Sequence, residues 1–219
     1  MAVIKNGILG GFSGKAGAVN GYRLMDQDIM RGPRNPRVSK PTEKELANQD
    51  KFGSSQYWLK PLKEVFRIGF QGYKQNSHGF NGAKSYISKN AMVKDDAGYH
   101  VDPALALISH GSLPFGDVAA ARLGEGFDIE FTWDYNKCAY NDRAMVVAYD
   151  TQNLNAVYDT GIAMRTVKKA TLKLNEEFAG KEVHLYLGFV SEDRKNRSIS
   201  RYLGMVTMPA VVAEVPTTM

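Results

Sequence analysis

The sequence predicts an α+β chain that is mainly β. We expect an N-terminal β-hairpin and a proline-rich arm, then short helices, then an antiparallel β-sandwich of the immunoglobulin or fibronectin type. Glycine recurs every few residues near the N-terminus, a helix-capping pattern starts at Thr42, and short alternating apolar runs follow from about Tyr99. The expected parts are residues 1–98 with the hairpin, arm and helices, residues 99–208 with the sandwich, and a flexible tail at 209–219.

The hairpin is predicted by alternating residues from Val19 to Leu24 that continue, after a polar turn, into Ile29–Arg31. We place its turn near Asp26-Gln27. An isolated two-stranded hairpin is marginal in water, so this one is expected to lie on the later domain or on another subunit. Glycines before it permit tight turns or close approach of two backbones.

Four cations recur at intervals of three in the segment that follows: Arg31, Arg34, Arg37 and Lys40. Three prolines in this segment exclude a helix or a central strand and favour polyproline II, which has three residues per turn. Such a backbone would align the cations along one edge that suits phosphates or carboxylates. A solvated linker is the simpler alternative.

Three short helices are expected next. Thr42 and Glu45 form a capping box, which predicts a helix that runs to about Trp58. Pro61 can begin a second helix, and a third is expected from Ala83 to Ala91. The second helix presents one apolar face: Leu62, Val65, Phe66 and Phe70.

The C-terminal half contains apolar runs separated by polar turns, which is typical of a β-sandwich. The strands expected are Ala104–Ser109, Phe127–Trp133, Ala144–Tyr149, Ala156–Tyr158 with Ile162–Arg165, Ala170–Leu174, Val183–Val190 and Ser198–Met208. Residues alternate strictly in Phe127–Trp133, which indicates a half-buried strand. The more uniformly apolar Val183–Val190 is expected to be central.

Composition limits the possible classes of protein. Apolar residues make up 43% and charged residues 23% of the 219 residues, which excludes a wholly disordered chain. A single cysteine, Cys138, excludes an internal disulfide and a cysteine-based zinc site. Apolar runs are too short for a signal peptide or a membrane helix, so we expect the chain in the cytoplasm or in a particle assembled there.

Charge is distributed unevenly. Met1–Lys74 holds thirteen Lys and Arg against six Asp and Glu, a net charge of +7, whereas the remainder has a net charge of −2. The basic third suggests an acidic partner, either nucleic acid or an acidic protein surface. A solubilising surface explains the charge equally well.

We expect no catalytic residue, no cofactor and no metal. The glycine-rich stretch before Lys15 is not a phosphate loop, because Leu9 replaces its first glycine and Ala16 replaces the hydroxyl residue that would hold magnesium. The four histidines lack the spacing of metal ligands. His110, which precedes Gly111 and Ser112, is the first choice if a site exists.

Motifs along nearly the whole chain resemble an uncharacterised bacterial family that has only a domain-of-unknown-function label. They are Gly10-Gly-Phe-Ser-Gly-Lys-Ala-Gly17, Gly21-Tyr-Arg, Pro41-Thr-Glu, Lys51-Phe, Leu59-Lys-Pro-Leu, Leu107-Ile-Ser-His-Gly-Ser-Leu-Pro114, Phe131-Thr-Trp-Asp134, Asp142-Arg-Ala-Met145 and Leu187-Gly-Phe-Val-Ser191. The resemblance implies a glycine-rich hairpin and a β-sandwich but no activity. The hairpin and the arm also resemble small phage and prophage proteins, which implies an assembly role.

The leading hypothesis is therefore a non-enzymatic structural or interaction subunit that associates with itself or with another protein by strand addition at a sheet edge. The interaction residues expected are Gly10, Gly11, Gly14, Lys15, Gly17, Arg31, Arg34, Arg37 and Lys40. The alternative is nucleic-acid binding through the basic arm. A third possibility is an enzyme whose site is assembled from distant residues.

Overall fold

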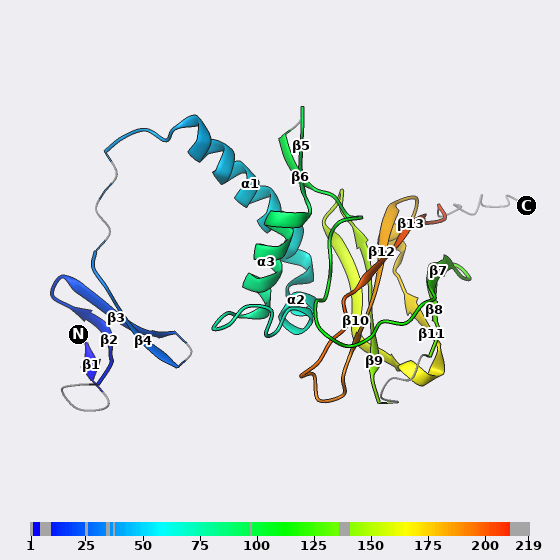
Figure 1. The fold of residues 1–219 in the computed structure, drawn as a ribbon. Coiled ribbons are helices and arrows are strands. Elements are labelled where there is room, and N and C mark those ends of the chain that lie inside the picture. Colours follow the sequence, from blue (N-terminus) through cyan, green and yellow to red (C-terminus); the bar gives the residue numbers. More distant parts are fainter. Residues whose placement is uncertain are drawn as a thin grey trace, which may run out of the picture. The chain divides into compact units, whose positions relative to one another are not determined.

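A computed structural model describes residues 2–4, 10–24, 26–33, 36, 38–96, 98–135 and 141–210. Its contacts divide the chain into two units, Met1–Glu45 and Leu46–Met219, and each is described by itself (Figure 1). Residues 211–219, which hold nearly all of the expected tail, lie outside the described residues.

The first unit is an antiparallel four-stranded sheet with the strand order β1-β2-β3-β4. Its strands are β1 (Val3–Ile4), β2 (Phe12–Ala16), β3 (Val19–Leu24) and β4 (Gln27–Arg31). The expected hairpin is β3 and β4, in which Leu24 pairs with Gln27, so that the chain turns between these two residues. The glycine-rich segment extends this hairpin, because it forms β2 and pairs with β3, and β1 in turn pairs with β2.

The helices begin and end close to the predicted residues. The capping box of α1 (Glu43–Leu59) is confirmed, because the Thr42 amide donates to Glu45 Oε2 at 2.8 Å and the Glu45 amide donates to Thr42 Oγ1 at 3.4 Å. Pro61 lies in the short 3₁₀ helix η1 (Lys60–Leu62), which leads into α2 (Lys63–Gly69). The third helix, α3 (Gly79–Asn90), begins before the expected Ala83.

The second unit contains an antiparallel β-sandwich, which confirms the predicted fold class. One sheet has the order β10-β9-β12-β13 and the other has the order β11-β8-β7. The strands are β7 (Ala119–Leu123), β8 (Asp128–Trp133), β9 (Arg143–Asp150), β10 (Asn155–Met164), β11 (Lys169–Lys173), β12 (Glu182–Val190) and β13 (Arg201–Thr207). A separate hairpin pairs β5 (Met92–Asp95) with β6 (Gly98–Val101).

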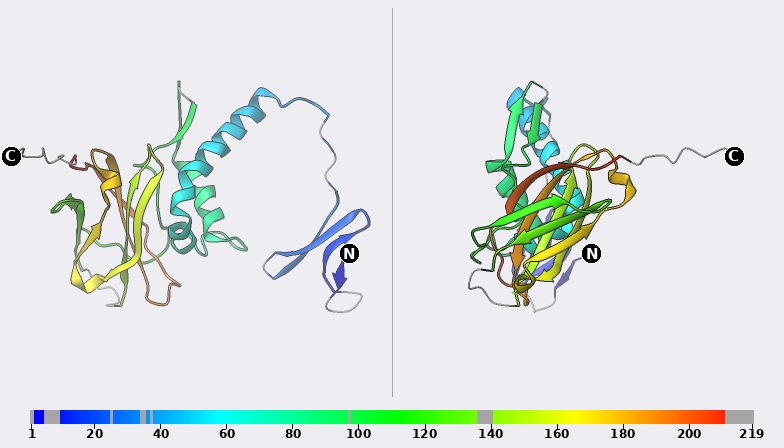
Figure 2. Two further views of the ribbon diagram at one scale, coloured as in Figure 1. Left: turned by 180° about the vertical axis from the view of Figure 1, so that it is seen from behind. Right: turned by 90° about the vertical axis from the view of Figure 1, so that its right-hand side faces the viewer.

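In the second unit, the sheet β10-β9-β12-β13 lies between the helices and the sheet β11-β8-β7 (Figure 2). Strand β9 shows why, since it is buried on both faces. Its residues Ala144, Val146 and Ala148 belong to the core between the two sheets. The alternate residues, Met145, Val147 and Tyr149, belong to the core under the helices. The neighbouring strand β12 is central in its sheet, as its uniformly apolar sequence predicts.

Several strand predictions need correction. Ala104–Ser109 is not a strand but a connection, and the amides of Ile108 and Ser109 donate to the buried Ser200 Oγ at 2.9 and 3.2 Å. The two pieces expected at 156–165 are one strand, β10, with an irregularity between Asp159 and Ala163. Strands β5, β6 and β7 were not predicted from the sequence.

The division between the units differs from the expected boundary at residues 98/99. Trp58, Phe66 and Ile87 of the helices share a core with Val147 and Tyr186 of the sheet. The helices therefore belong with the sandwich, because their apolar faces are buried against it.

Candidate functional site in the N-terminal sheet

The predicted interaction residues are distributed over the first unit. Gly14 and Lys15 lie in β2, Gly17 lies in the turn that follows, and Arg31 is the last residue of β4. Gly10 and Gly11 precede β2, and Lys40 precedes α1. Arg34 and Arg37 lie outside the described residues, so the expected row of four cations is described only at its two ends.

Arg31 pairs with Asn20 as the last residue of β4, which agrees with the predicted hairpin strand Ile29–Arg31. Asn20 in turn pairs with Lys15. The register therefore places Lys15, Asn20 and Arg31 in one row across three strands and on one face of the sheet.

The glycines shape the sheet itself. Gly17 has a φ of +58° in the turn between β2 and β3, a conformation that favours glycine. Gly21 is buried, and a Cβ there would stand 2.6 Å from the ring of Phe12 and 2.4 Å from its carbonyl oxygen. Phe12 therefore packs directly across Gly21, a role that the glycine spacing in the sequence did not reveal.

Both faces of this sheet carry apolar side chains. Strand pairing and alternation place Ile4, Phe12, Val19 and Met30 on one face, and Val3, Tyr22, Leu24 and Ile29 on the other. Met30 is 68% exposed and Val3 is 54% exposed. Among the residues of these four strands, all of which the structure describes, Gly21 alone is buried. The sheet thus has no core of its own.

The charges on the sheet are of both signs. Arg23 lies opposite Asp28 across β3 and β4, and it approaches the exposed Asp26 at 3.5 Å. Over Met1–Glu45 the sequence holds eight Lys and Arg against four Asp and Glu, a net charge of +4. The unit is therefore moderately basic, with some of its charge balanced locally.

Two further properties concern the whole described part of the chain. Across the ranges that the structure describes, no three or more His, Cys, Asp and Glu side chains come together as a group that could hold a metal ion. None of the helices in those ranges combines the length and the apolar character needed to cross a membrane.

Comparison with known proteins gives a family and a distant structural neighbour. The fibronectin type III domain of the human collagen alpha-1(XX) chain aligns with 49% of this chain and 94% of its own, at 12% identity and a TM-score of 0.35. No curated protein matches the chain. The model of a family of unknown function, DUF6266, matches residues 11–204, so the chain belongs to that family.

Proposed function

We propose that this chain is a non-enzymatic assembly subunit that self-associates through its N-terminal sheet. The observation that supports this proposal is the apolar surface on both faces of a sheet that lacks its own core. A sheet is stable when at least one face packs on another layer. Burying a half-exposed apolar side chain contributes on the order of 1 kcal/mol, so a second copy that covers several of them would stabilise both sheets.

The edge strand β4 suggests how two copies would meet. It pairs with β3 on one side, and no described strand pairs with its other side. Antiparallel pairing of two β4 strands about Ile29 would place Gln27 opposite Arg31 and Asp28 opposite Met30. No like charges would face each other, so pairing around a two-fold axis is electrostatically acceptable.

Sedimentation velocity of the full chain at about 100 μM, a concentration that detects weak specific association, tests the proposal. We expect an oligomer that Met30→Glu dissociates, because the substitution would place a carboxylate directly opposite Asp28 of the second copy. Val118→Glu is the matched control, since Val118 is 63% exposed and lies in the other unit.

Two results would contradict self-association. Self-association is excluded if the full chain is a monomer and the chain that lacks residues 1–40 is a monomer too. A monomer whose melting temperature falls on that deletion would show instead that the sheet docks on its own sandwich. Recovery of a different protein as the sole stable partner would also reject a self-associating subunit.

Nucleic-acid binding is the second candidate, and the Lys15–Asn20–Arg31 row favours it. All three side chains are exposed and lie on one face, where cations can follow a phosphate backbone. Binding to duplex DNA would then weaken steeply between 50 and 200 mM salt, by roughly tenfold for each two or so phosphates contacted. Lys15→Ala with Arg31→Ala would reduce that salt dependence, whereas salt-independent binding would reject this candidate.

A further inference from the structure

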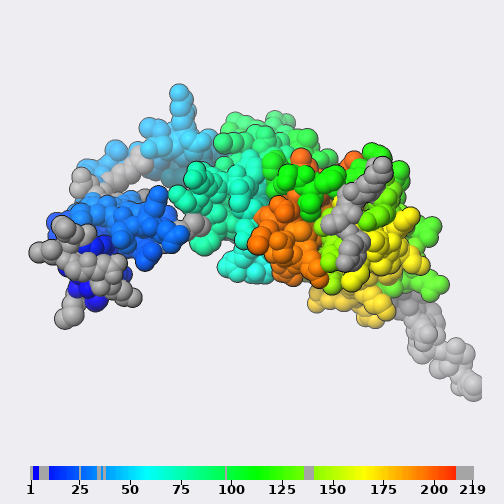
Figure 3. All heavy atoms as spheres, turned by 60° about the horizontal axis from the view of Figure 1, so that its bottom comes forward, coloured from blue at the N-terminus to red at the C-terminus, as the bar shows by residue number. Residues whose placement is uncertain are grey.

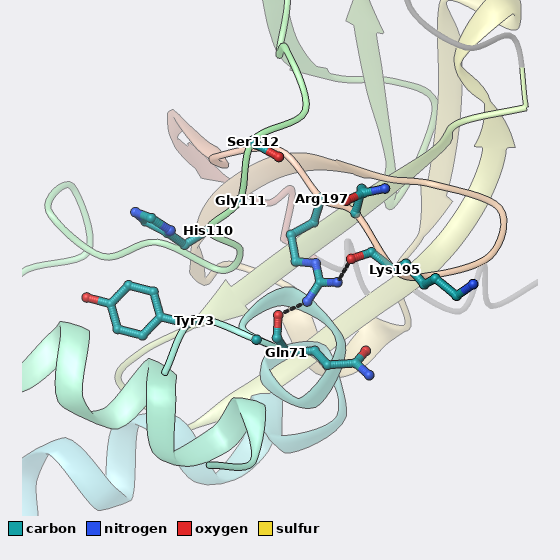
Figure 4. Close-up of a pocket in the computed structure, with 9 residues that line it drawn as sticks. Gln71, Tyr73, His110, Gly111, Ser112, Lys195 and Arg197 are labelled. Atoms are coloured by element: carbon teal, nitrogen blue, oxygen red, sulfur yellow. Dashed lines mark hydrogen bonds between the residues drawn. The ribbon is translucent and has the colours of Figure 1, made fainter. Parts of the chain in front are cut away.

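A polar pocket of about 410 Å³ lies in the second unit, where three loops meet (Figure 4). One loop follows α2, the second connects β6 to β7, and the third connects β12 to β13. Figure 3 shows the third loop, in orange, at the surface beside the cyan segment near residue 70. The lining residues are Gln71, Gly72, Tyr73, His110, Gly111, Ser112, Lys195, Asn196 and Arg197.

The backbones of these loops are bound tightly to one another. The His110 amide donates to the Gly69 carbonyl oxygen at 2.9 Å, and the Leu113 amide donates to the Arg197 carbonyl oxygen at 2.9 Å. A Cβ at Gly111 would stand 2.2 Å from that same oxygen, so the close approach requires glycine here. The pocket is therefore formed before any ligand arrives.

Arg197 lies at the centre of the pocket with an exposed fraction of only 4%. Its guanidinium donates to the carbonyl oxygens of Gln71, Arg194 and Lys195, and Figure 4 shows two of these bonds. Burial lowers the pKa of Arg197, and the charge of Asp193 opposes this effect. No described carboxylate lies within ion-pair distance of the guanidinium, so its direct partners are neutral carbonyl dipoles.

Three other polar side chains of the pocket are available to a ligand. Those of His110, Ser112 and Asn196 make no hydrogen bond to any described residue. The His110 ring is held edge-on against Tyr73, with centroids 4.9 Å apart, and both rings lie on the same side of Arg197 in Figure 4. Lys195 adds a second cation, which is exposed and lies 3.7 Å from the carboxylate of Asp193, and none of the lining residues is acidic.

We propose that this pocket binds a small oxyanion, the phosphoryl or carboxyl group of a soluble ligand. Arg197 supplies a fixed positive potential, and the Ser112 hydroxyl and the Asn196 amide donate hydrogen bonds. His110 adds a ring nitrogen donor, and the exposed Lys195 adds positive charge that Asp193 balances in part. Every charged residue that lines the pocket is a cation, and polar donors surround it, which favours an anion as the ligand.

The test is a titration of the full chain followed by amide NMR shifts, with inorganic phosphate, sodium acetate and sodium chloride at matched ionic strength. Saturable shifts centred on Tyr73, Gly111 and Asn196 are expected with phosphate or acetate and not with chloride. The probe that binds with the higher affinity identifies the ligand group. Tighter binding of phosphate indicates a phosphoryl group, and tighter binding of acetate indicates a carboxyl group. The proposal is overturned if neither phosphate nor acetate saturates the shifts by about 50 mM, a concentration well above millimolar affinity.

Two variants localise the binding. Asn196→Asp places a carboxylate in the pocket without changing its shape, and it should weaken binding by about tenfold or more. Gln152→Glu makes the same change in the turn between β9 and β10. The pairing of Val190 with Arg143 puts that turn at the opposite end of the sheet, so this control should bind normally.

Ser112→Ala keeps the proposal testable if Asn196→Asp fails to fold. It removes one donor that has no described partner, so the fold should be retained and the affinity should fall severalfold. Equal affinity in Ser112→Ala and the unaltered chain, or equal affinity in a folded Asn196→Asp, would show that the anion binds elsewhere and would overturn the proposal.

Discussion

The hydroxyl of Tyr149 on β9 donates a 2.9 Å hydrogen bond to the backbone carbonyl oxygen of Trp58 near the end of α1. The two rings meet edge to face, with centroids 5.3 Å apart and an interplanar angle of 76°. Burial raises the pKa of Tyr149, which keeps the hydroxyl protonated as a donor. This contact joins the helical layer to the middle of the sheet.

Tyr149→Phe should lower the free energy of unfolding by about 1–2 kcal/mol, because it removes the donor and leaves the Trp58 carbonyl with one partner fewer in the core. Urea denaturation measures this change. Tyr57→Phe is the control, since Tyr57 is 66% exposed on the same helix and should change stability by less than about 0.5 kcal/mol. Equal effects of the two substitutions would contradict this role for the hydroxyl.

Gly69→Ala should destabilise the second unit strongly. A Cβ there would stand 2.1 Å from the carbonyl oxygen of Ile108, so either α2 or the connection after β6 must move. We expect a loss above about 2 kcal/mol in the free energy of unfolding. Gly53→Ala gives the opposite sign, a gain of about 0.5–1 kcal/mol, because Gly53 is inside α1 with no atom within 4 Å of its missing Cβ.

Arg165 is fully buried and donates to the carbonyl oxygen of Pro114 at 2.7 Å and to that of Phe115, with Asp142 3.8 Å away. Arg165→Met should therefore cost about 3–5 kcal/mol at pH 7, because it leaves a buried carboxylate without its cation. Asp142→Asn added to Arg165→Met should recover part of that loss. If the double variant recovers no stability, the lost hydrogen bonds from Arg165 to the carbonyl oxygens account for the whole loss in Arg165→Met.

The Arg165→Met variant should also show a distinctive dependence on pH. Burial is the main cause of the raised pKa of Asp142, and Arg165 opposes it. A raised folded-state pKa gives stability that is present below the unfolded-state value near 3.9 and is lost as pH rises through the folded-state pKa. Without Arg165 the pKa rises further, so the deficit relative to the unaltered chain should shrink as pH falls from 7 towards 4. A constant deficit in thermal melts over this range would contradict the assignment.

His184 should make the second unit less stable in mild acid. Burial lowers the pKa of His184, whose Nδ1 lies 2.9 Å from the Tyr202 hydroxyl, despite opposing acidic groups that include Glu182. The unfolded chain binds a proton near pH 6.5 while the folded chain resists it, so stability falls as pH drops below about 6.5 towards the folded-state pKa. His184→Gln should flatten the change in melting temperature between pH 7.5 and 5. The exposed His78 serves as control, and His78→Gln should retain the slope.

The sequence by itself determined the features that depend on near neighbours. Thr42 and Glu45 are three residues apart, and their mutual hydrogen bonds begin α1 as the capping box predicts. The alternation in β8 and the apolar run in β12 also predicted one half-buried strand and one central strand. Such patterns are legible because side-chain spacing along a helix or strand is fixed by local geometry.

Other features were decided only by the tertiary structure. Ala104–Ser109 alternates like a strand, yet the Ile108 and Ser109 amides donate to Ser200, which is more than ninety residues away. The alanine-rich β7 has weak strand propensity and exists through its pairing with β8. No local pattern specifies either outcome.

In the N-terminal sheet and in the pocket, too, the sequence predicted some features and the tertiary structure decided others. Alternating residues predicted the hairpin of β3 and β4, but the register decided that Phe12 packs on Gly21 and that apolar residues appear on both faces. His110 stood out in the sequence, and it was the fold that placed it beside Arg197, 87 positions further along the chain. Distant residues meet only when the packing of whole layers fixes the loops between them, because burying those layers supplies the free energy that orders the loops.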